Sequence, residues 1–286
     1  MLNLTNMKTT IVFLALFVSS VASFAGGGWT YKKGKGFVKI SQTAIYGDQL
    51  FNPDGEVIDI RTIGYYATSA YAEYGISDKI TAIAYAPFFT RNTLNAIEFI
   101  QTKEEIPGDE LNSFGDIDLS IQYGFYQSDT WVASVRVLFG LPTGKVNGGE
   151  TGILQSGDGE FNQMIRFDLS RPISDKSWIS FYAGFNNRTN DFSDEYRLGG
   201  EYGTRLGSSF YTILKLDVVQ SFFNGEADAS QGGTIFSNDT EFISPAIELA
   251  YELDNQIGFS FSAGGAFAAR NILAAPNLAV GVYKKF

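Results

Sequence analysis

Apolar and polar residues alternate along most of the chain, and the pattern is clearest between residues 116 and 125. One face of this segment carries apolar side chains: Ile117, Leu119, Ile121, Tyr123 and Phe125. The other face carries small or polar residues: Asp118, Ser120, Gln122 and Gly124. A period of two predicts a β-strand that is apolar on one side and polar on the other. Residues 131–140 repeat the pattern after a short turn at 127–130.

The same unit, two alternating segments joined by a short turn, recurs along the chain. Short connections lie at 75–79, 127–130, 172–176, 206–209 and 254–256. The alternate connections are mostly longer and polar or rich in glycine: 47–63, 91–115, 143–160, 189–193, 223–241 and 268–277. With a first strand at 36–46 and a last strand at 278–286, the pattern predicts twelve strands.

Each segment has about 9–12 residues, the length that a tilted strand needs to cross a bilayer. Short turns on one side and long loops on the other are typical of outer-membrane barrels, whose turns face the periplasm. A closed barrel also leaves no sheet edge exposed to lipid. The pattern therefore predicts an all-β protein: a 12-stranded, antiparallel, up-and-down transmembrane β-barrel with short periplasmic turns and long extracellular loops.

Aromatic residues near the strand ends predict two belts at the membrane–water interfaces. The periplasmic belt comprises Tyr74, Phe210, Tyr251 and Phe286. The outer belt comprises Phe89, Phe139, Phe185, Tyr196, Phe222 and Phe267. Trp131 and Trp178 each open a strand after a short turn, and we expect both at one depth within the belts. Pro245 lies inside a predicted strand, which indicates a bulge or a later strand start.

The two ends of the chain add to this prediction. Residues 7–25 combine a basic start at Lys8, an apolar run and the small-residue site Ser23-Phe24-Ala25, the pattern of a secretory signal. We therefore expect residues 1–25 to be a cleaved signal peptide, 26–35 a short periplasmic segment and 36–286 the barrel. Whether residues 26–35 plug the lumen is left open by the sequence. The terminal Phe286 resembles the signal that the barrel-assembly machinery reads, which predicts that machinery as a partner.

Composition narrows the class of protein further. The net charge of −10 argues against nucleic acid as a partner, because phosphate binding needs basic patches. The chain has neither cysteine nor histidine, which removes disulfides, thiolate chemistry, the commonest general base and most transition-metal sites. No apolar run after the signal approaches the ~18–20 residues of a membrane helix. We expect no enzyme activity and no cofactor, and a location in the outer membrane with its lipid as a partner.

Two other β-architectures share part of this pattern. A soluble β-sandwich or periplasmic barrel would also alternate, but it needs neither strands of this length nor paired aromatic belts. An autotransporter translocator also has twelve strands, but a passenger should precede it, and here the first strand begins soon after the signal.

The polar face of the strands carries charges of both signs. The candidate lumen residues are Arg136, Arg166, Asp168, Glu195, Arg197, Glu201, Lys215 and Asp217. Further inward charges are Lys39, Glu73, Asp116, Asp118, Arg205, Glu248 and Glu252. Such a set suits either an interior lattice of ion pairs or a charged path for a ligand. A barrel of twelve strands lies between filled small barrels and open porins, so both interpretations stand.

Three chemical alternatives arise from the same residues. Paired carboxylates such as Asp116 with Asp118 also occur in hydrolases, but the alternation of polar and apolar residues produces such pairs without any catalytic role. The loop 157–160 offers oxygen ligands for a divalent cation, although a glycine-rich turn is favoured. Residues 140–145 lack the spacing of a phosphate-binding loop, because one residue is missing between the glycines and Val146 follows Lys145.

Three strings in the middle of the chain resemble a known family: Gly115-Asp116-Ile117-Asp118-Leu119, Leu141-Pro142-Thr143-Gly144 and Gly157-Asp158-Gly159. The family is the outer-membrane group labelled as meta-pathway phenol-degradation proteins and often called simply transporters. The segment Gly27-Gly28-Trp29-Thr30-Tyr31-Lys32-Lys33-Gly34 resembles Bacteroidetes members of that group. The resemblance covers nearly the whole mature chain and implies a barrel and uptake of aromatic or other hydrophobic compounds. It supplies no binding residues.

The leading functional hypothesis is an outer-membrane channel or transporter for passive or facilitated uptake of small molecules, of hydrophobic or aromatic character. The alternative is a closed structural or surface-interaction barrel that acts through its extracellular loops at 91–115, 143–160 and 223–241. An open lumen would distinguish the first from the second.

Overall fold

The computed structural model describes residues 27–286 except 100, 102, 104, 227–228 and 230–234. The expected signal peptide therefore lies outside the described residues. Within them, no helix has the length and apolar character needed to cross a bilayer.

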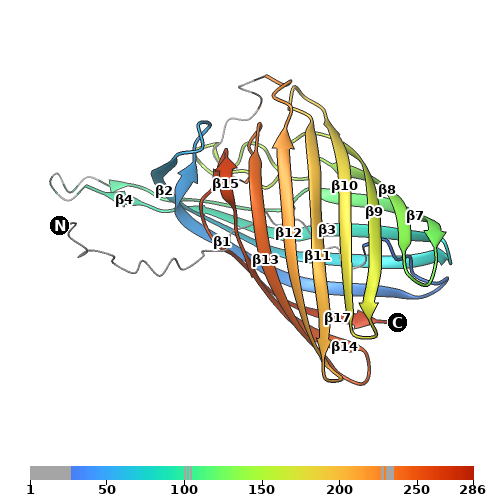
Figure 1. Ribbon diagram of the computed structural model, residues 1–286. Helices are drawn as coiled ribbons and strands as arrows, with labels where there is room; N and C mark the ends of the chain where they lie inside the picture. Colours follow the sequence, from blue (N-terminus) through green and yellow to red (C-terminus); the bar gives the residue numbers. More distant parts are fainter. Residues whose placement is uncertain (1–26, 100, 102, 104, 227–228, 230–234) are drawn as a thin grey trace, which may run out of the picture.

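Twelve long strands form one closed antiparallel wall (Figure 1). They are β1 (Gly36–Phe51), β2 (Val57–Ser77), β3 (Ile80–Leu94), β7 (Ile117–Gln127), β8 (Val132–Leu141), β9 (Asn162–Ser174), β10 (Ser177–Arg188), β11 (Glu195–Leu206), β12 (Phe210–Ser221), β13 (Glu241–Glu252), β14 (Ile257–Gly264) and β17 (Asn277–Lys285). Each pairs with its neighbours in order, β12 pairs with β13, and β1 pairs with β17. This closure confirms the predicted 12-stranded barrel.

Five short strands lie at the end of the barrel that carries the long loops. They are β4 (Ile97–Glu98), β5 (Glu105–Ile106), β6 (Asp109–Ser113), β15 (Phe267–Arg270) and β16 (Ile272–Leu273). β6 pairs with β3 and β16 with β1, so parts of the expected loops continue the sheet. The β4–β5 hairpin projects away from the wall in Figure 1.

The connection expected as a loop at 47–63 is instead mostly strand. β1 and β2 continue to pair up to Phe51 and Val57, which leaves only residues 52–56 as a turn. β16 supplies a second partner to this extension, where Leu50 faces Leu273 and Phe51 faces Ile272. Charged residues in this stretch broke the alternation, so the sequence pattern did not show the extended hairpin.

The outer face of the wall is apolar and the inner face is polar. On β7, Leu119, Ile121 and Tyr123 are exposed, whereas Ser120 and Gln122 are buried in the interior. Residues expected in the two aromatic belts lie together on the outer face: Tyr74 stacks on Phe286 at 6.5 Å between ring centroids, and Phe185, Tyr196 and Phe222 form a cluster. Such an apolar surface on a closed barrel is covered by the hydrocarbon of a bilayer. The protein is a transmembrane barrel of the outer-membrane type.

Pro245 lies within β13 and marks neither a bulge nor a strand start. Its register with Leu216 of β12 is regular. Its carbonyl accepts a hydrogen bond from the N–H of Gly265 on the other side, at the break between β14 and β15. The backbone nitrogen of a strand residue points to the same side as its carbonyl, so the missing N–H faces a place where the ladder is already interrupted.

The segment before β1 enters the barrel from the periplasmic end and lies in the lumen. At the rim, the N–H of Gly34 donates to the carbonyl of Gly75 at 2.8 Å. Deeper inside, the N–H of Gly28 donates to Ser170 Oγ at 2.7 Å, and Gln122 Nε2 donates to the carbonyl of Gly27 at 2.8 Å. A Cβ on Gly27 would lie 2.4 Å from Ser170 Oγ, and its φ is +50°, so only glycine fits there. We call residues 27–31 the plug.

Candidate functional site

The lumen holds three cavities in series along the inner face of β9 to β12. The outer cavity has a volume of about 120 Å³ and the central cavity also about 120 Å³. The third, at the periplasmic end, measures about 520 Å³. Arg166, Tyr182 and Asp217 line both the outer and the central cavity, and Glu201 lines both the central and the periplasmic one. Shared walls of this kind define a route along the barrel with two partitions.

The partition between the outer and central cavities is a stacked and hydrogen-bonded trio. The guanidinium carbon of Arg166 lies 3.8 Å from the centroid of the Tyr182 ring. The Tyr182 hydroxyl donates to Asp217, and Arg166 Nε donates to Asp168 Oδ1 at 2.9 Å. The ion pair thus lies within β9, and Tyr182 of β10 connects it to Asp217 of β12.

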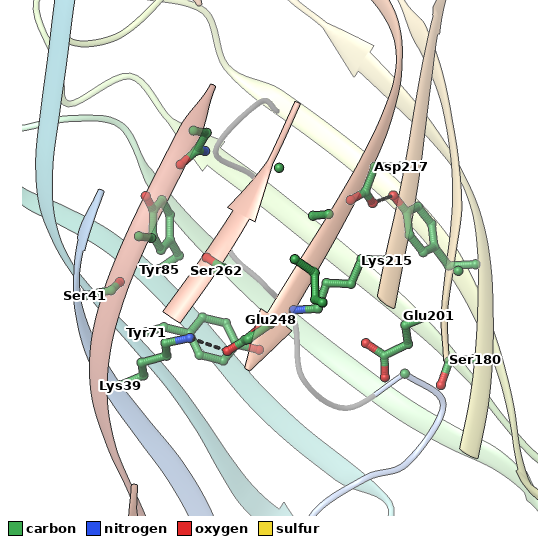
Figure 2. A pocket seen from close by; sticks show the side chains of 18 of the residues that line it. Lys39, Ser41, Tyr71, Tyr85, Ser180, Glu201, Lys215, Asp217, Glu248 and Ser262 are labelled. Carbon is green, nitrogen blue, oxygen red and sulfur yellow. Dashed lines mark hydrogen bonds and ion pairs between the residues drawn. The ribbon is translucent and has the colours of Figure 1, made fainter. Parts of the chain in front are cut away.

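The central cavity is organised around Glu248 on β13, as Figure 2 shows. Lys39 Nζ lies 2.7 Å from one carboxylate oxygen of Glu248, and Lys215 Nζ lies 2.5 Å from the other. These contacts join β1, β12 and β13 across the lumen. The two cations share one carboxylate, and Glu201 and Asp217 line the same cavity, so charges of both signs face its interior.

A relay of polar contacts connects the plug to the wall. Arg136 on β8 is almost fully buried, and its Nη2 donates to Gln122 Oε1 at 3.0 Å. Gln122 in turn donates to the plug at Gly27 and to Ser134 Oγ at 2.6 Å. Because the amide of Gln122 serves both partners, Arg136 orients the group that holds the plug.

The periplasmic chamber, our name for the 520 Å³ cavity, is lined by five aromatic residues among other side chains. Trp29 and Tyr31 contribute from the plug, Phe37 from β1, Trp178 from β10 and Tyr211 from β12. Trp178 Nε1 donates to Glu201 Oε1 at 2.8 Å. Trp178 shares the inward phase of Ser180 and Tyr182 and faces the chamber, whereas Trp131 lies on the outer face beside Arg171.

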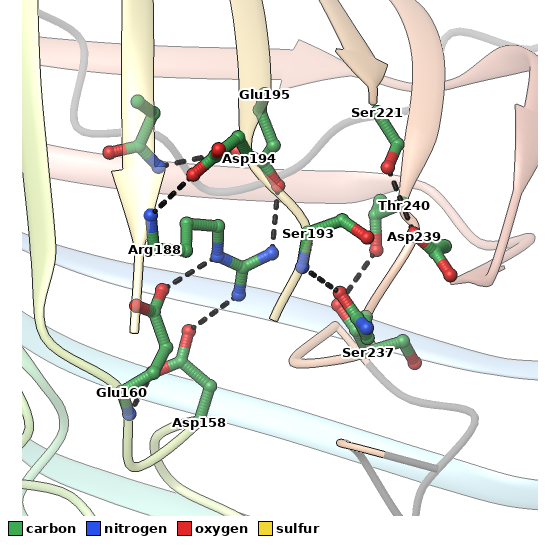
Figure 3. A network of polar contacts seen from close by, with 12 residues as sticks. Asp158, Glu160, Arg188, Ser193, Asp194, Glu195, Ser221, Ser237, Asp239 and Thr240 are labelled. Carbon is green, nitrogen blue, oxygen red and sulfur yellow. Dashed lines mark hydrogen bonds and ion pairs between the residues drawn. The ribbon is translucent and has the colours of Figure 1, made fainter. Parts of the chain in front are cut away.

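A knot of charges at the extracellular rim folds the loop 142–161 inward (Figure 3). Arg188 at the end of β10 contacts three carboxylates, Asp158 at 3.1 Å, Glu160 at 2.7 Å and Glu195 at 2.9 Å. Arg197 also donates to Glu195, from Nη2 at 2.7 Å. Burial raises the pKa of Glu160 to about 7 despite the Arg188 guanidinium beside it.

The cation site considered at residues 157–160 is not supported. Asp158 and Glu160 are both engaged by Arg188, and within the described ranges no group of acidic side chains is arranged to hold a metal ion. The segment is a glycine-containing connection that leads into β9.

The three strings that carry the family resemblance form one interlocked unit. Asp116 accepts hydrogen bonds from the N–H of Gly144 at 2.8 Å and from the N–H of Asp158 at 3.0 Å. A Cβ on Gly157 would lie 2.2 Å from Asp116 Oδ1, so the loop can approach this carboxylate only through glycine. Each string therefore supplies a part that the other two require.

Asp116, in the loop before β7, gives this unit a dependence on pH. Burial and the negative charge of Asp158 raise the pKa of Asp116 to about 7. The pKa of Asp116 is higher in the closed loop than in the open loop, so the closed loop keeps a proton that the open loop releases. The free energy that favours the closed loop therefore falls as the pH rises from about 4 towards 7.

We expect the bond after Lys145 to become several-fold more accessible to trypsin at pH 8 than at pH 6. The backbone of Lys145 is held by Ser156, so cleavage requires the loop to open. Rates are normalised to an unstructured peptide of the same sequence at each pH. The variant Asp116→Asn should lose this pH dependence; an equal dependence in the variant would assign it to another group.

The eight candidate lumen residues all lie on the inward face, with different neighbours. Six line the cavities: Arg166, Asp168, Arg197, Glu201, Lys215 and Asp217. Arg136 lies behind the plug and Glu195 within the rim knot. Sequence reasoning considered only charges and so missed the aromatic lining, although alternation from Ser180 would have placed Tyr182 and Trp178 inside.

The fold of this chain is similar to that of solved outer-membrane proteins. No family model and no curated protein matches the chain. The structure is similar to an outer-membrane channel from Pseudomonas putida F1, with 12% identity, a TM-score of 0.66 and coverage of 91% of this chain and 98% of that one. It is also similar to the NanC porin, with 12% identity, a TM-score of 0.53 and coverage of 87% and 100%. At these identities the likeness shows the fold, which is that of outer-membrane barrel channels.

Proposed function

We propose that this barrel is an outer-membrane channel for passive or facilitated uptake of small molecules. The observation that carries the proposal is the series of three cavities whose shared walls run from the extracellular rim to the periplasmic end. A barrel that served only as a scaffold would gain nothing from such a series, whose cavities are separated by a few side chains.

The proposed substrates are hydrophobic or aromatic compounds. The central cavity is lined by Tyr71, Tyr85 and Tyr182 together with ion pairs, and the periplasmic chamber by five further aromatic residues. Aromatic faces offer contact area to flat apolar molecules, and the fixed charges offer orientation.

A second candidate, a closed structural or surface-interaction barrel, is favoured by a different observation. The plug and the inward loop 142–161 obstruct the lumen at its two ends. Single-channel conductance of the refolded barrel in planar bilayers separates the two. Stable current steps support the channel; a silent bilayer containing folded barrel supports the closed alternative and contradicts the simple diffusion pore.

Arg166→Ala combined with Asp168→Ala should raise conductance and change ion selectivity. The change removes the guanidinium that lies over Tyr182 and so opens the partition between the outer and central cavities. We expect a measurable shift in reversal potential under a salt gradient and faster uptake into liposomes.

Arg171→Ala is the matched control, because Arg171 lies on the same strand with its side chain towards Trp131 on the outer face. If the double variant behaves like this control in both assays, the proposed route along β9 is wrong.

A further inference from the structure

We propose that the periplasmic chamber is a binding site for planar aromatic carboxylates, with Trp29 and Trp178 holding the ring and Arg205 the carboxylate. This inference deepens the proposed function and rests on it for its physiological meaning. The site itself is defined by contacts that do not depend on transport.

The chamber is built to accept a flat apolar group. Gly203, opposite Trp178 on β11, has no side chain, and a Cβ there would lie 2.0 Å from Trp178 Cζ2. The indole therefore lies directly against the wall, and its Nε1 is fixed by Glu201. Trp29 and Tyr31 line the same cavity from the plug. Aromatic walls from two separate elements favour stacking with a ring between them.

The chamber also contains a cation that lacks a partner. Arg205, near the periplasmic end of β11, lines the cavity, and its buried Nε has no hydrogen-bond partner among the described residues. Buried polar groups in proteins are nearly always hydrogen-bonded, so such an atom points to a missing acceptor. The planar guanidinium matches a carboxylate with two parallel hydrogen bonds.

Arg205 is the cation of the chamber best placed for this role. Lys285 pairs with Glu252 at 2.5 Å, Glu201 accepts a hydrogen bond from Trp178, and Asp175 and Lys176 lie exposed in the turn between β9 and β10. Tyr211 faces Arg205 across the β11–β12 ladder, so an aromatic face and the free guanidinium stand side by side. The volume of about 520 Å³ lies within the ~300–1,000 Å³ of small-molecule sites. The chamber therefore offers aromatic side chains to bind a ring and a guanidinium to bind a carboxylate.

Tryptophan fluorescence can report on this site directly. The chain has three tryptophans, and the variant Trp131→Phe leaves only Trp29 and Trp178, both of which line the chamber. In detergent micelles this variant is titrated with 2-naphthoate, whose absorption overlaps tryptophan emission. The uncharged 2-naphthylmethanol tests the ring alone, and acetate tests the charge alone.

We expect saturable quenching by 2-naphthoate, with an affinity at least about tenfold above that for 2-naphthylmethanol, because a charged hydrogen bond contributes on that scale. Acetate at the same concentrations should not displace the naphthoate. Arg205→Gln should weaken naphthoate binding about tenfold and leave naphthylmethanol binding unchanged. Arg171→Gln, which removes a cation outside the chamber, should bind like the parent.

Two results would overturn the assignment: equal affinities for the charged and uncharged probes, or no loss of naphthoate affinity in Arg205→Gln when its gel mobility shows a folded barrel. Conductance measured on the same preparations keeps the two proposals apart. A silent barrel that binds naphthoate retains the site but contradicts the channel, and a conducting barrel that does not bind contradicts only the site.

Discussion

A disulfide between positions 30 and 124 is expected to hold the plug in the lumen, and its reduction to raise conductance several-fold. The ideal Cβ of Gly124 on β7 lies 3.8 Å from the Cβ of Thr30. That separation is about the mean for Cβ atoms in disulfides, ~3.8 Å. The chain contains no cysteine, so the pair Thr30→Cys and Gly124→Cys would form the only bridge.

The physical reason is that the plug is held by a few hydrogen bonds and by the packing of Tyr31 against the apolar cluster that includes Phe37 and Tyr71. Gln122, Ser170 and Thr81 each bond its backbone, and each such bond contributes only about 0.5–1.5 kcal/mol net. A segment with this attachment can leave the lumen when its contacts are replaced by water. Planar-bilayer recordings before and after addition of a reductant measure the effect on the same molecules.

Each single cysteine variant serves as a control for the oxidant and the reductant. A chain lacking residues 27–33 should match the reduced pair, since both free the lumen. If oxidised and reduced pairs conduct equally while the deletion conducts more, the plug obstructs the lumen but does not move. If all three conduct alike, the plug is not the barrier.

Replacing Arg188 with methionine should be the most destabilising of the lumen substitutions. Removal of this one cation leaves Asp158 and Glu160 without their ion pair and Glu195 with Arg197 alone, and Glu160 is wholly buried. Breaking a buried ion pair in this way costs about 3–5 kcal/mol. The free energy of unfolding is measured by urea titration of the barrel in detergent micelles.

Arg91→Met is the matched control, because Arg91 pairs with Glu110 on an extension outside the lumen where both side chains are about half exposed. An exposed pair contributes about 0–1 kcal/mol. Arg188→Lys should fall between the two, since an ammonium cannot reach three carboxylates from one position. Equal losses for Arg188→Met and Arg91→Met would show that the rim knot carries no net stability.

The period-two pattern was sufficient to predict the barrel strands because only one face of each contacts lipid. On β7 alternation assigned each residue from 117 to 125 to the side on which the structure places it; on β8 it did so for most residues from 131 to 140, and it left out Val132 and Leu138, which lie on the inner face. The pattern reports which face a side chain occupies. It reports neither depth nor the partners that cross the lumen.

The features that the alternation did not predict are not marked by any periodic pattern in the sequence. The plug begins with Gly27 and Gly28, whose value lies in close approach to Ser170 and Val132 rather than in side chains. The extended β1–β2 hairpin is interrupted by Asp48 and held by β16, a partner more than two hundred residues away along the chain. The rim knot joins Asp158 to Arg188 and Glu195, which lie at or near the ends of the neighbouring strands β9, β10 and β11, and the alternation along one strand does not show such contacts.

The interlocked unit around Asp116 has a consequence for how this chain can vary. Its three strings lie far apart in the sequence, yet the carboxylate of Asp116, the N–H of Gly144 and the missing side chain of Gly157 fit only together. A change in any one of them would leave the other two without a function and would survive only with compensating changes. The strings should therefore be inherited as a block, and a homologue that has lost one of them should have lost all three.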